Sequence, residues 1–345
     1  MLRRARRSID AAVYEVGPSY AWILAEAARN GVRVRLLLNG HASDGNGSTA
    51  RDVTRAGGEC RVLGRGSAPG HWKLLIVDGT RVAAGTGNLI WRDAPRDPHH
   101  MLPPAAAALS GTREWWVLAQ KTPRLAVDAA RGFEAAWQRA GPPQKQWPVA
   151  PRIAPGDVGA PRPQVAPLTI RVAEARLRLV VGGLPVALAL SRLIAGARDR
   201  ALVTAPYAHP RAAAVRALVA GLRDAASRGV DARLLLGDRP GPVELAWLQA
   251  TGVPVRWMDA SSSTRGHAKG LVADDVAVVA SANWSGAGCG RNWEAAVVVR
   301  IPAAAGYFAD AWERDWRAAE PLTARVWGIP GADMLPSWSP STIHP

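Results

Sequence analysis

The feature that most limits the folds open to this sequence is a short pattern, H-x-K-x4-D, that occurs twice. The two copies supply the same three residue types, His71, Lys73 and Asp78 in "GHWKLLIVDG" and His267, Lys269 and Asp274 in "GHAKGLVADD". In each copy, polar residues flank an apolar stretch typical of a buried strand, where an unpaired charge is costly. The repeat therefore predicts two related structural units whose polar residues have a specific task.

The segments around the pattern also repeat in the same order. Residues 8–16, 20–31 and 32–40 read as strand, helix and strand, and residues 200–208, 214–229 and 230–238 repeat that order. Each half also ends on aromatic residues at helical spacing, Phe133 with Trp137 and Phe308 with Trp312, which we interpret as core anchors. Alternating strands and helices predict two α/β lobes with mostly parallel β-sheets flanked by helices.

A proline-rich segment separates the halves. Eight prolines lie between Gly141 and Pro167, which is typical of a semi-extended linker. We therefore expect a first lobe at 1–140, a linker at 141–167, a second lobe at 168–322 and a C-terminal tail at 323–345. The second half has an additional strand at 176–182 and an additional helix at 186–197. We expect either that the first lobe lacks them or that its true start lies upstream.

Composition bears on partners and location. The chain has 43 Lys and Arg against 28 Asp and Glu, a net charge of +15, which suits phosphate-bearing partners but equally a solvated basic surface. No apolar run reaches the ~18 to 20 residues that span a bilayer, and the start of the chain lacks the apolar region of a signal peptide. We expect a cytoplasmic or peripheral membrane protein as written, or a secreted one if the N-terminus is incomplete. The two cysteines, Cys60 and Cys289, say little about the compartment.

Spacing separates the roles within each pattern. Side chains two residues apart on a strand point to the same face, so His71 and Lys73 can meet one substrate. Only four of the 43 basic residues are lysines, and two of them stand in the pattern, where a compact ammonium can approach a phosphate oxygen. Asp78 lies roughly 23 Å from His71 along an extended strand, so Asp78 and its counterpart Asp274 are predicted to hold turns.

Each copy is followed by an asparagine and then by a glutamate. The loops "GTGN" and "ASAN" end in Asn88 and Asn283, and their small residues would let the backbone approach a phosphate. A catalytic histidine needs a carboxylate on its second ring nitrogen. The candidates are Glu114 and Glu294, each of which opens a strand at a matching place. Singly, these loops and glutamates would equally suit a glycine-rich turn and a solvated strand end.

The paired motifs, each with its loop asparagine and strand-leading glutamate, resemble the phospholipase D superfamily over nearly the whole chain outside the linker and tail. The resemblance implies two α/β lobes about a pseudo-twofold axis with one shared active site. It also implies double-displacement chemistry through a phosphohistidine, with no metal and no other cofactor. By this resemblance His71 is the nucleophile and His267 the general acid, although the pseudo-symmetry leaves the reverse open. Lys73, Lys269, Asn88 and Asn283 would bind the phosphate oxygens.

The sequence departs from the family pattern in places that remove no catalytic residue, so we expect an active enzyme. Thr86 stands where serine is commoner, and Ala280 where glycine is. Between Trp91 and Thr112 the first half carries an insertion that the second lacks. Its His99 and His100 could suggest a metal site, but no Cys, Asp or Glu stands at supporting spacing, and we expect none.

The substrate is the least determined part of this interpretation. We favour a monomeric phospholipase or phosphatidyl transferase acting on phospholipids, because tryptophans and arginines could seat the chain on an anionic membrane surface. The alternative is a metal-independent endonuclease of the same superfamily acting on nucleic acid, which the basic charge favours. A cardiolipin synthase ranks lower, because that branch often carries membrane spans, and a non-enzymatic binding module ranks lowest.

Overall fold

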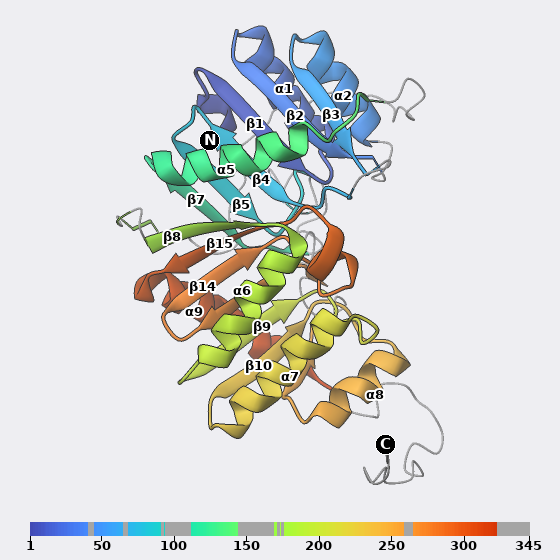
Figure 1. The fold of residues 1–345 in the computed structure, drawn as a ribbon, viewed down its shortest axis with the longest axis vertical. Helices are drawn as coiled ribbons and strands as arrows, with labels where there is room; N and C mark the ends of the chain where they lie inside the picture. Colours follow the sequence, from blue (N-terminus) through green and yellow to red (C-terminus); the bar gives the residue numbers. More distant parts are fainter. Residues whose placement is uncertain are drawn as a thin grey trace.

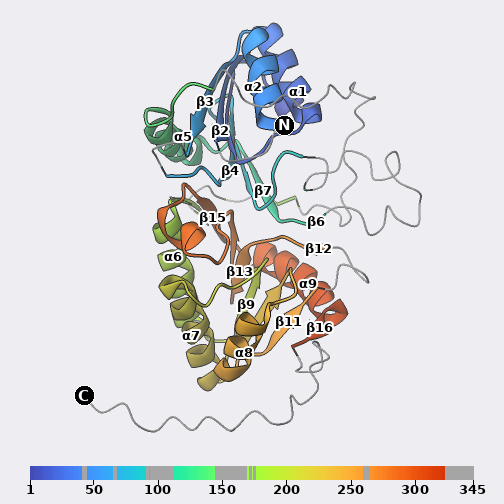
Figure 2. The same cartoon turned by 90° about the vertical axis from the view of Figure 1, so that its right-hand side faces the viewer.

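A computed structural model of the chain describes residues 1–40, 45–64, 68–90, 93, 112–143, 169–170, 173, 176–258 and 265–322. They form two lobes stacked along the long axis of the molecule (Figures 1 and 2). Most of the predicted linker, the predicted tail, and His99 and His100 lie outside the described residues, so the domain boundaries stay predictions. Within the described part of the chain, no helix combines the length and apolarity that a membrane crossing needs.

The first lobe is built on a six-stranded sheet of order β3-β2-β1-β4-β5-β7. Its elements are the 3-10 turn η1 (Leu2–Arg4), β1 (Ser8–Val13), α1 (Pro18–Arg29), β2 (Arg33–Asn39), α2 (Gly45–Arg55), β3 (Glu59–Leu63), β4 (Lys73–Val77), β5 (Arg81–Gly85), β6 (Thr112–Arg113), β7 (Trp116–Gln120) and α5 (Pro123–Trp137). Helices α1 and α2 pack against each other, and α5 packs on strands β1, β4 and β5.

The second lobe repeats this plan in an eight-stranded sheet of order β16-β11-β10-β9-β13-β14-β15-β8. Its elements are β8 (Leu177–Val181), α6 (Gly183–Gly196), β9 (Arg200–Ala205), α7 (Ala213–Ser227), β10 (Asp231–Leu236), α8 (Pro242–Thr251), β11 (Val255–Trp257), β12 (Arg265–Gly266), β13 (Gly270–Ala273), β14 (Val276–Ala280), the π-helical turn η3 (Ala287–Arg291), β15 (Ala295–Arg300), α9 (Pro302–Ala318) and β16 (Glu320–Pro321). Among the described residues of the first lobe, β8 and α6 have no counterpart.

The expected α/β lobes flanked by helices are confirmed, but the expectation of mostly parallel sheets is wrong. Only the pairs β1–β2, β2–β3, β9–β10 and β10–β11 are parallel within the two large sheets. The strands that carry the H-x-K-x4-D pattern, β4 and β13, run antiparallel to both neighbours. Each is joined to its return strand by a short turn, and a short turn can only connect antiparallel strands.

Both lobes contribute to one shared hydrophobic core. Leu74 and Ile76 of β4 lie in the same buried cluster as Val272 of β13 and Val297 of β15. The predicted aromatic anchors of α5 and α9 belong to this cluster, and Phe133 and Trp312 have no exposed surface. Two separate clusters lie under α1 and under α6 and α7 on the outer sides of the sheets. The lobes are therefore held together by a common core.

The repeat extends to a partly buried arginine in each lobe. Arg35 of β2 lies over the rings of Phe133 and Trp137, and its Nε donates to Asp10 at 2.8 Å. In the second lobe, Arg233 of β10 lies over the rings of Trp312 and Trp316. Each guanidinium thus ties the last helix of its lobe to the sheet by charge and stacking.

Candidate active site

The ends of β4 and β13 meet between the lobes. His71 lies just before β4, and its backbone N–H donates to Trp293 O of the second lobe at 2.9 Å. His267 lies just before β13, and its N–H donates to Arg113 O of the first lobe at 3.1 Å. The short strands β6 and β12 pair across the same boundary. The two motif histidines are therefore held by backbone bonds from the opposite lobe.

Each histidine bonds the glutamate of the other lobe. His71 Nδ1 lies 3.1 Å from Glu294 Oε1, and His267 Nδ1 lies 2.5 Å from Glu114 Oε1. Both glutamates are buried in the site, and the charges of the lysines and histidines lower their pKa although burial alone would raise it. A carboxylate on Nδ1 leaves Nε2 of each ring for chemistry. The sequence predicted these glutamates but not that they cross between the lobes.

Two hydroxyls hold the glutamates, and the sequence-based prediction missed both. Thr86 donates to Glu114 Oε2 and Ser281 donates to Glu294 Oε2. The same hydroxyls accept the backbone N–H of Trp115 at 2.9 Å and of Ala295 at 3.0 Å. Their matched positions in the loops "GTGN" and "ASAN" were the available signal.

The two lysines are almost completely buried, at 0% and 1% exposure. Burial lowers the pKa of Lys73 to about 8 and that of Lys269 to about 7. Lys73 Nζ donates to His71 O at 2.6 Å and lies 3.1 Å from His71 Nε2. Lys269 Nζ donates to His267 O and, across the lobe boundary, to Thr86 O at 3.3 Å. The predicted placement of histidine and lysine on one face is thus present in both lobes.

The surroundings of the His71 ring favour its neutral form. Desolvation, followed by the nearby charge of Lys73, lowers the pKa of His71 although Glu294 raises it. The ring of Tyr14 packs edge-on at 5.0 Å between centroids. Its repeat counterpart Tyr207 lies beside the side chain of Asn283. The tyrosines match between the halves of the sequence, but that match gave no indication of a place in the site.

The loop asparagines are differently engaged. Asn88 donates from its backbone N and from Nδ2 to Asp93 Oδ2, both at 2.9 Å. The Oδ1 atoms of Asn88 and Asn283 are buried without a hydrogen-bond partner in the described structure. One Nδ2 proton of Asn88 is therefore committed to Asp93. A role of either asparagine in holding phosphate stays a prediction.

The motif aspartates lie at the far ends of the strands. Asp78, at a positive φ of 54°, accepts backbone N–H bonds from Arg6, Arg7 and Ser8 at the start of β1. Asp274, at a φ of 47°, accepts the equivalent bonds from Arg198, Asp199 and Arg200. Each aspartate therefore ties its turn to the neighbouring strand and contacts neither histidine.

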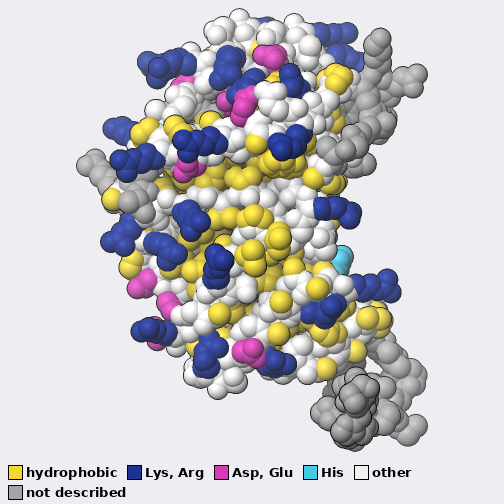
Figure 3. Space-filling view, viewed as in Figure 1, with side chains coloured by type: hydrophobic (Ala, Val, Ile, Leu, Met, Phe, Trp, Pro, Cys, Tyr) yellow, Lys and Arg dark blue, Asp and Glu magenta, His cyan; other side chains and the backbone are white. Residues whose placement is uncertain are grey.

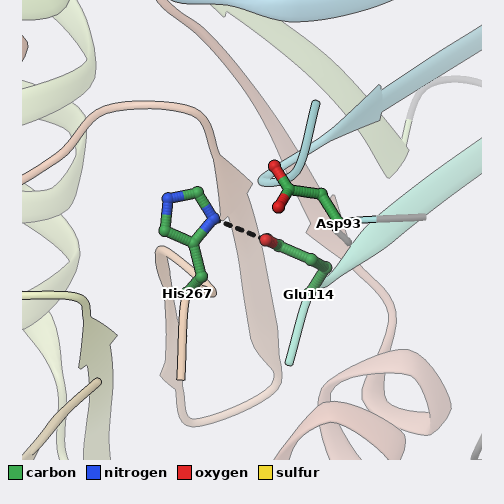
Figure 4. Close-up of side chains that lie close together, drawn as sticks. All are labelled: Asp93, Glu114 and His267. Atoms are coloured by element: carbon green, nitrogen blue, oxygen red, sulfur yellow. Dashed lines mark hydrogen bonds and ion pairs between the residues drawn. The ribbon is translucent and has the colours of Figure 1, made fainter. Parts of the chain in front are cut away.

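Asp93, Glu114 and His267 form a cluster whose ligand atoms lie within 4.8 Å of one another (Figure 4). Zn²⁺ would need each ligand atom at about 2.0–2.2 Å. The Nδ1 of His267 is instead bonded directly to Glu114, and Asp93 is bonded to Asn88. We interpret the cluster as a hydrogen-bond network; that the site works without metal stays a prediction.

The comparison with known families agrees with this geometry. Residues 1–97 and 190–316, more than half of the chain, match the family described as "Cardiolipin synthase, PLD-like domain". The chain belongs to the phospholipase D superfamily. A search of curated proteins found no match.

Solved structures share the fold of this phospholipase D-like chain. Phosphatidylserine synthase of Haemophilus influenzae is 11% identical with a TM-score of 0.61, covering 93% of this chain and 83% of its own. Polyphosphate kinase of Porphyromonas gingivalis is 16% identical with a TM-score of 0.59, covering 91% of this chain and 43% of its own. Nuc of Salmonella typhimurium, a phospholipase D family member, is 22% identical with a TM-score of 0.35, covering 42% of this chain and 97% of its own. At these identities, the likeness to the synthase and to the kinase is one of fold.

Proposed function

We propose that the protein is a phosphodiesterase that acts through a phosphohistidine. The observation that carries this proposal is the pair of histidines, each with a glutamate from the opposite lobe on Nδ1 and a buried lysine two residues along the chain. A buried ammonium beside each ring suits the non-bridging oxygens of a phosphodiester, where charge gathers in the transition state. The glutamates fix the ring orientation that attack by Nε2 requires.

The reaction takes two steps. In the first, His71 Nε2 forms a bond to phosphorus, the bond to the leaving oxygen breaks, and that oxygen takes the Nε2 proton of His267. In the second, a water or alcohol oxygen bonds to phosphorus while its proton passes to His267 Nε2. The phosphorus–nitrogen bond then breaks and leaves His71 neutral.

We propose a phospholipid as the substrate, with the phosphatidyl group hydrolysed or transferred. The matching family is described by cardiolipin synthase, and a structure with the same fold is named phosphatidylserine synthase. A surface groove of about 400 Å³ between α6 and the outer strands β8 and β15 supports this choice, and we call it the α6 groove. Its apolar lining includes Val180, Leu188 and Val298.

The side chains of the α6 groove suit binding to an anionic lipid surface. Leu184 and Leu188 on α6 are 52% and 47% exposed. The groove is lined by three exposed arginines, Arg178, Arg192 and Arg300. Figure 3 shows this face, with hydrophobic side chains gathered over α6 and basic side chains around them. Exposed leucines beside guanidinium groups suit acyl chains and phosphate headgroups together.

An endonuclease is the second candidate, and the net charge of +15 favours it. The two are separated by incubating the protein in EDTA with phosphatidylcholine vesicles and, separately, with single-stranded DNA. We expect choline release; DNA cleavage alone would support the nuclease. His71→Ala and His267→Ala should each reduce turnover by roughly 100- to 10,000-fold. The exposed Arg131→Ala variant of α5 is the control. Turnover that survives in the double variant would refute the phosphohistidine mechanism.

A further inference from the structure

The two halves of the site differ in one buried carboxylate. Asp93, which is 5% exposed, lies beside the pair of Glu114 and His267 (Figure 4). It follows Asn88 by five residues, and the residue five after Asn283 is Gly288. Among the described residues, no such cluster of three ligand-type side chains forms around His71 and Glu294. The pseudo-symmetry of the repeat is therefore broken on the His267 side.

The contacts of the two lysines also differ between the two halves of the site. Lys73 Nζ lies 3.1 Å from His71 Nε2, whereas Lys269 Nζ bonds backbone oxygens of Thr86 and His267. An ammonium group has no lone pair, so Nε2 of His71 must be the acceptor in that contact. His71 Nε2 is thereby unprotonated, with its lone pair directed toward Lys73.

We propose that Asp93 is a positioning residue that assigns the two histidines their roles, by stabilising the imidazolium form of His267 so that His267 donates the proton and His71 attacks phosphorus. The proposal rests on the phosphodiesterase function proposed above. It adds the reason why two nearly equivalent histidines do not exchange tasks.

The hydrogen bonds show that Asp93 acts as a carboxylate. Its Oδ2 accepts two N–H donors of Asn88, and Thr112 Oγ1 lies 3.4 Å from its Oδ1. A negative charge within about 4–6 Å favours the charged form of a base. Asp93 and Glu114 lie in one cluster with His267, whereas Glu294 is bonded to His71 and the charge of Glu15 acts on Lys73.

The site contains other charged groups besides Asp93. The charge of Asp93 partly opposes the burial that lowers the pKa of both lysines, and it favours the charged form of Arg265, so it reaches across the site. The lysines oppose a positive charge on either ring. Among the described residues, the charged groups around the two histidines are Glu114, Asp93, Lys269, Lys73, Glu294, Glu15 and Arg265. Asp93, Arg265 and Glu15 each lack a charged counterpart in the other half. Arg265 pairs with Asp238 and the charge of Glu15 acts on Lys73, so Asp93 is the unmatched carboxylate that lies in one cluster with His267.

Asp93→Asn tests the proposal, because it keeps the size of the side chain and removes the charge. The ring of His267 is followed by NMR in protein with isotope-labelled histidine, with the signal assigned through His267→Gln. At a fixed pH, we expect Asp93→Asn to move the ring signal of His267 toward that of the neutral form, and Asp93→Glu to behave like the wild type. An unchanged titration of His267 in Asp93→Asn would overturn the proposal.

Asp10→Asn is the matched control, because Asp10 is a buried acid of the same lobe, 6% exposed, that pairs with Arg35 instead of the site. It should leave the His267 titration unchanged. If Asp93→Asn does not fold, Asp93→Ser gives the same comparison with a smaller side chain. The trapped phosphoenzyme should carry its phosphate on His71, and phosphate on His267 would also refute the assignment.

Turnover of bis(p-nitrophenyl) phosphate in EDTA separates this inference from the proposed function. If the wild type shows no turnover, the proposed phosphodiesterase function and the catalytic roles of the histidines are refuted. A His267 signal that still shifts in Asp93→Asn would nevertheless establish the coupling between Asp93 and His267. Turnover in the wild type with an unshifted His267 would refute the role of Asp93 alone. Because Lys269 also titrates near neutral pH, the NMR signal decides the result and the pH–rate profile supports it.

Discussion

At the scale of single residues, the candidate site depends on side chains that reach no substrate themselves. Thr86 and Ser281 each use one hydroxyl to donate to a glutamate and to accept a backbone N–H. The glutamate is fixed by this bond, and the histidine is fixed by the glutamate. Orientation therefore passes from a loop of one lobe to a histidine of the other.

Removing either hydroxyl should loosen this arrangement. We expect Thr86→Ala or Ser281→Ala to lower kcat about tenfold with little change in KM, a fraction of the roughly 100- to 10,000-fold that acid–base catalysis contributes. Thr86→Ser should retain activity because it keeps the hydroxyl. Steady-state kinetics on a phosphodiester substrate measure both effects.

Thr122→Ala is the matched control. Thr122 is also a buried threonine of the first lobe, but its hydroxyl has no hydrogen-bond partner in the described structure. Its loss should leave kcat unchanged. Equal losses of activity in Thr122→Ala and Thr86→Ala would show that the effect comes from packing and not from Glu114.

At the scale of elements, the hairpin from β4 to β5 is fastened by Asp78. Backbone N–H groups of Arg7, Ser8 and Arg6, together with Arg81, lower the pKa of Asp78 to about 2 although burial opposes this. Because the pKa of Asp78 is lowered in the folded protein, its carboxylate stabilises the fold fully at pH values above the ordinary pKa of 3.8. That stabilisation is lost as the pH falls toward 2.

Asp78→Asn should destabilise the protein by about 2 kcal/mol at pH 7, because the carboxylate of Asp78 accepts several N–H donors. Asparagine tolerates the positive φ, so the backbone of the turn is kept. The difference in the free energy of unfolding between the variant and the wild type should narrow as the pH is lowered from 7 to 3. Urea unfolding at each pH measures this difference. Asp224→Asn on the exposed surface of α7 should have no effect. A difference that does not depend on pH would contradict the role of the charge.

The elements also show where sequence patterns reach their limit. Asp78 and Gly79 predicted a hairpin, and β4 and β5 are antiparallel. The alternation of strands and helices nevertheless suggested mostly parallel sheets, because each lobe begins with a βαβ unit. The later strands of each lobe pair antiparallel with their neighbours, and they set the character of both sheets.

At the scale of the whole molecule, the site exists only where the two lobes meet. The partners His71 and Glu294 are 223 residues apart in the chain, and His267 and Glu114 are 153 apart. The shared core between the sheets holds these pairs in place. The α6 groove lies largely on α6 and β8, which have no counterpart in the described first lobe, so the outer surface does not share the symmetry of the site.

If the α6 groove seats the protein on anionic lipid, its three arginines should account for much of the affinity. Replacing Arg178, Arg192 and Arg300 by Gln should weaken binding to phosphatidylglycerol vesicles about a hundredfold, at about 1 kcal/mol for each arginine. Vesicle co-sedimentation at fixed salt measures this. The control is the same charge change on the exposed Arg29, Arg51 and Arg55 of α1 and α2. Equal losses of vesicle affinity in both triple variants would mean that binding depends on the net charge of the protein and not on the α6 groove.

The sequence by itself determined the α/β repeat and the residues His71, Lys73, His267, Lys269, Glu114 and Glu294, because strand periodicity and a duplicated spacing are local properties of the chain. Only the tertiary structure decided that the glutamates cross between lobes, that two loop hydroxyls hold them, and that Asp93 lies beside His267. Such contacts depend on how two units pack about a shared core. Asp93 stands in a segment that the second half does not repeat, so no comparison between the halves could have revealed it.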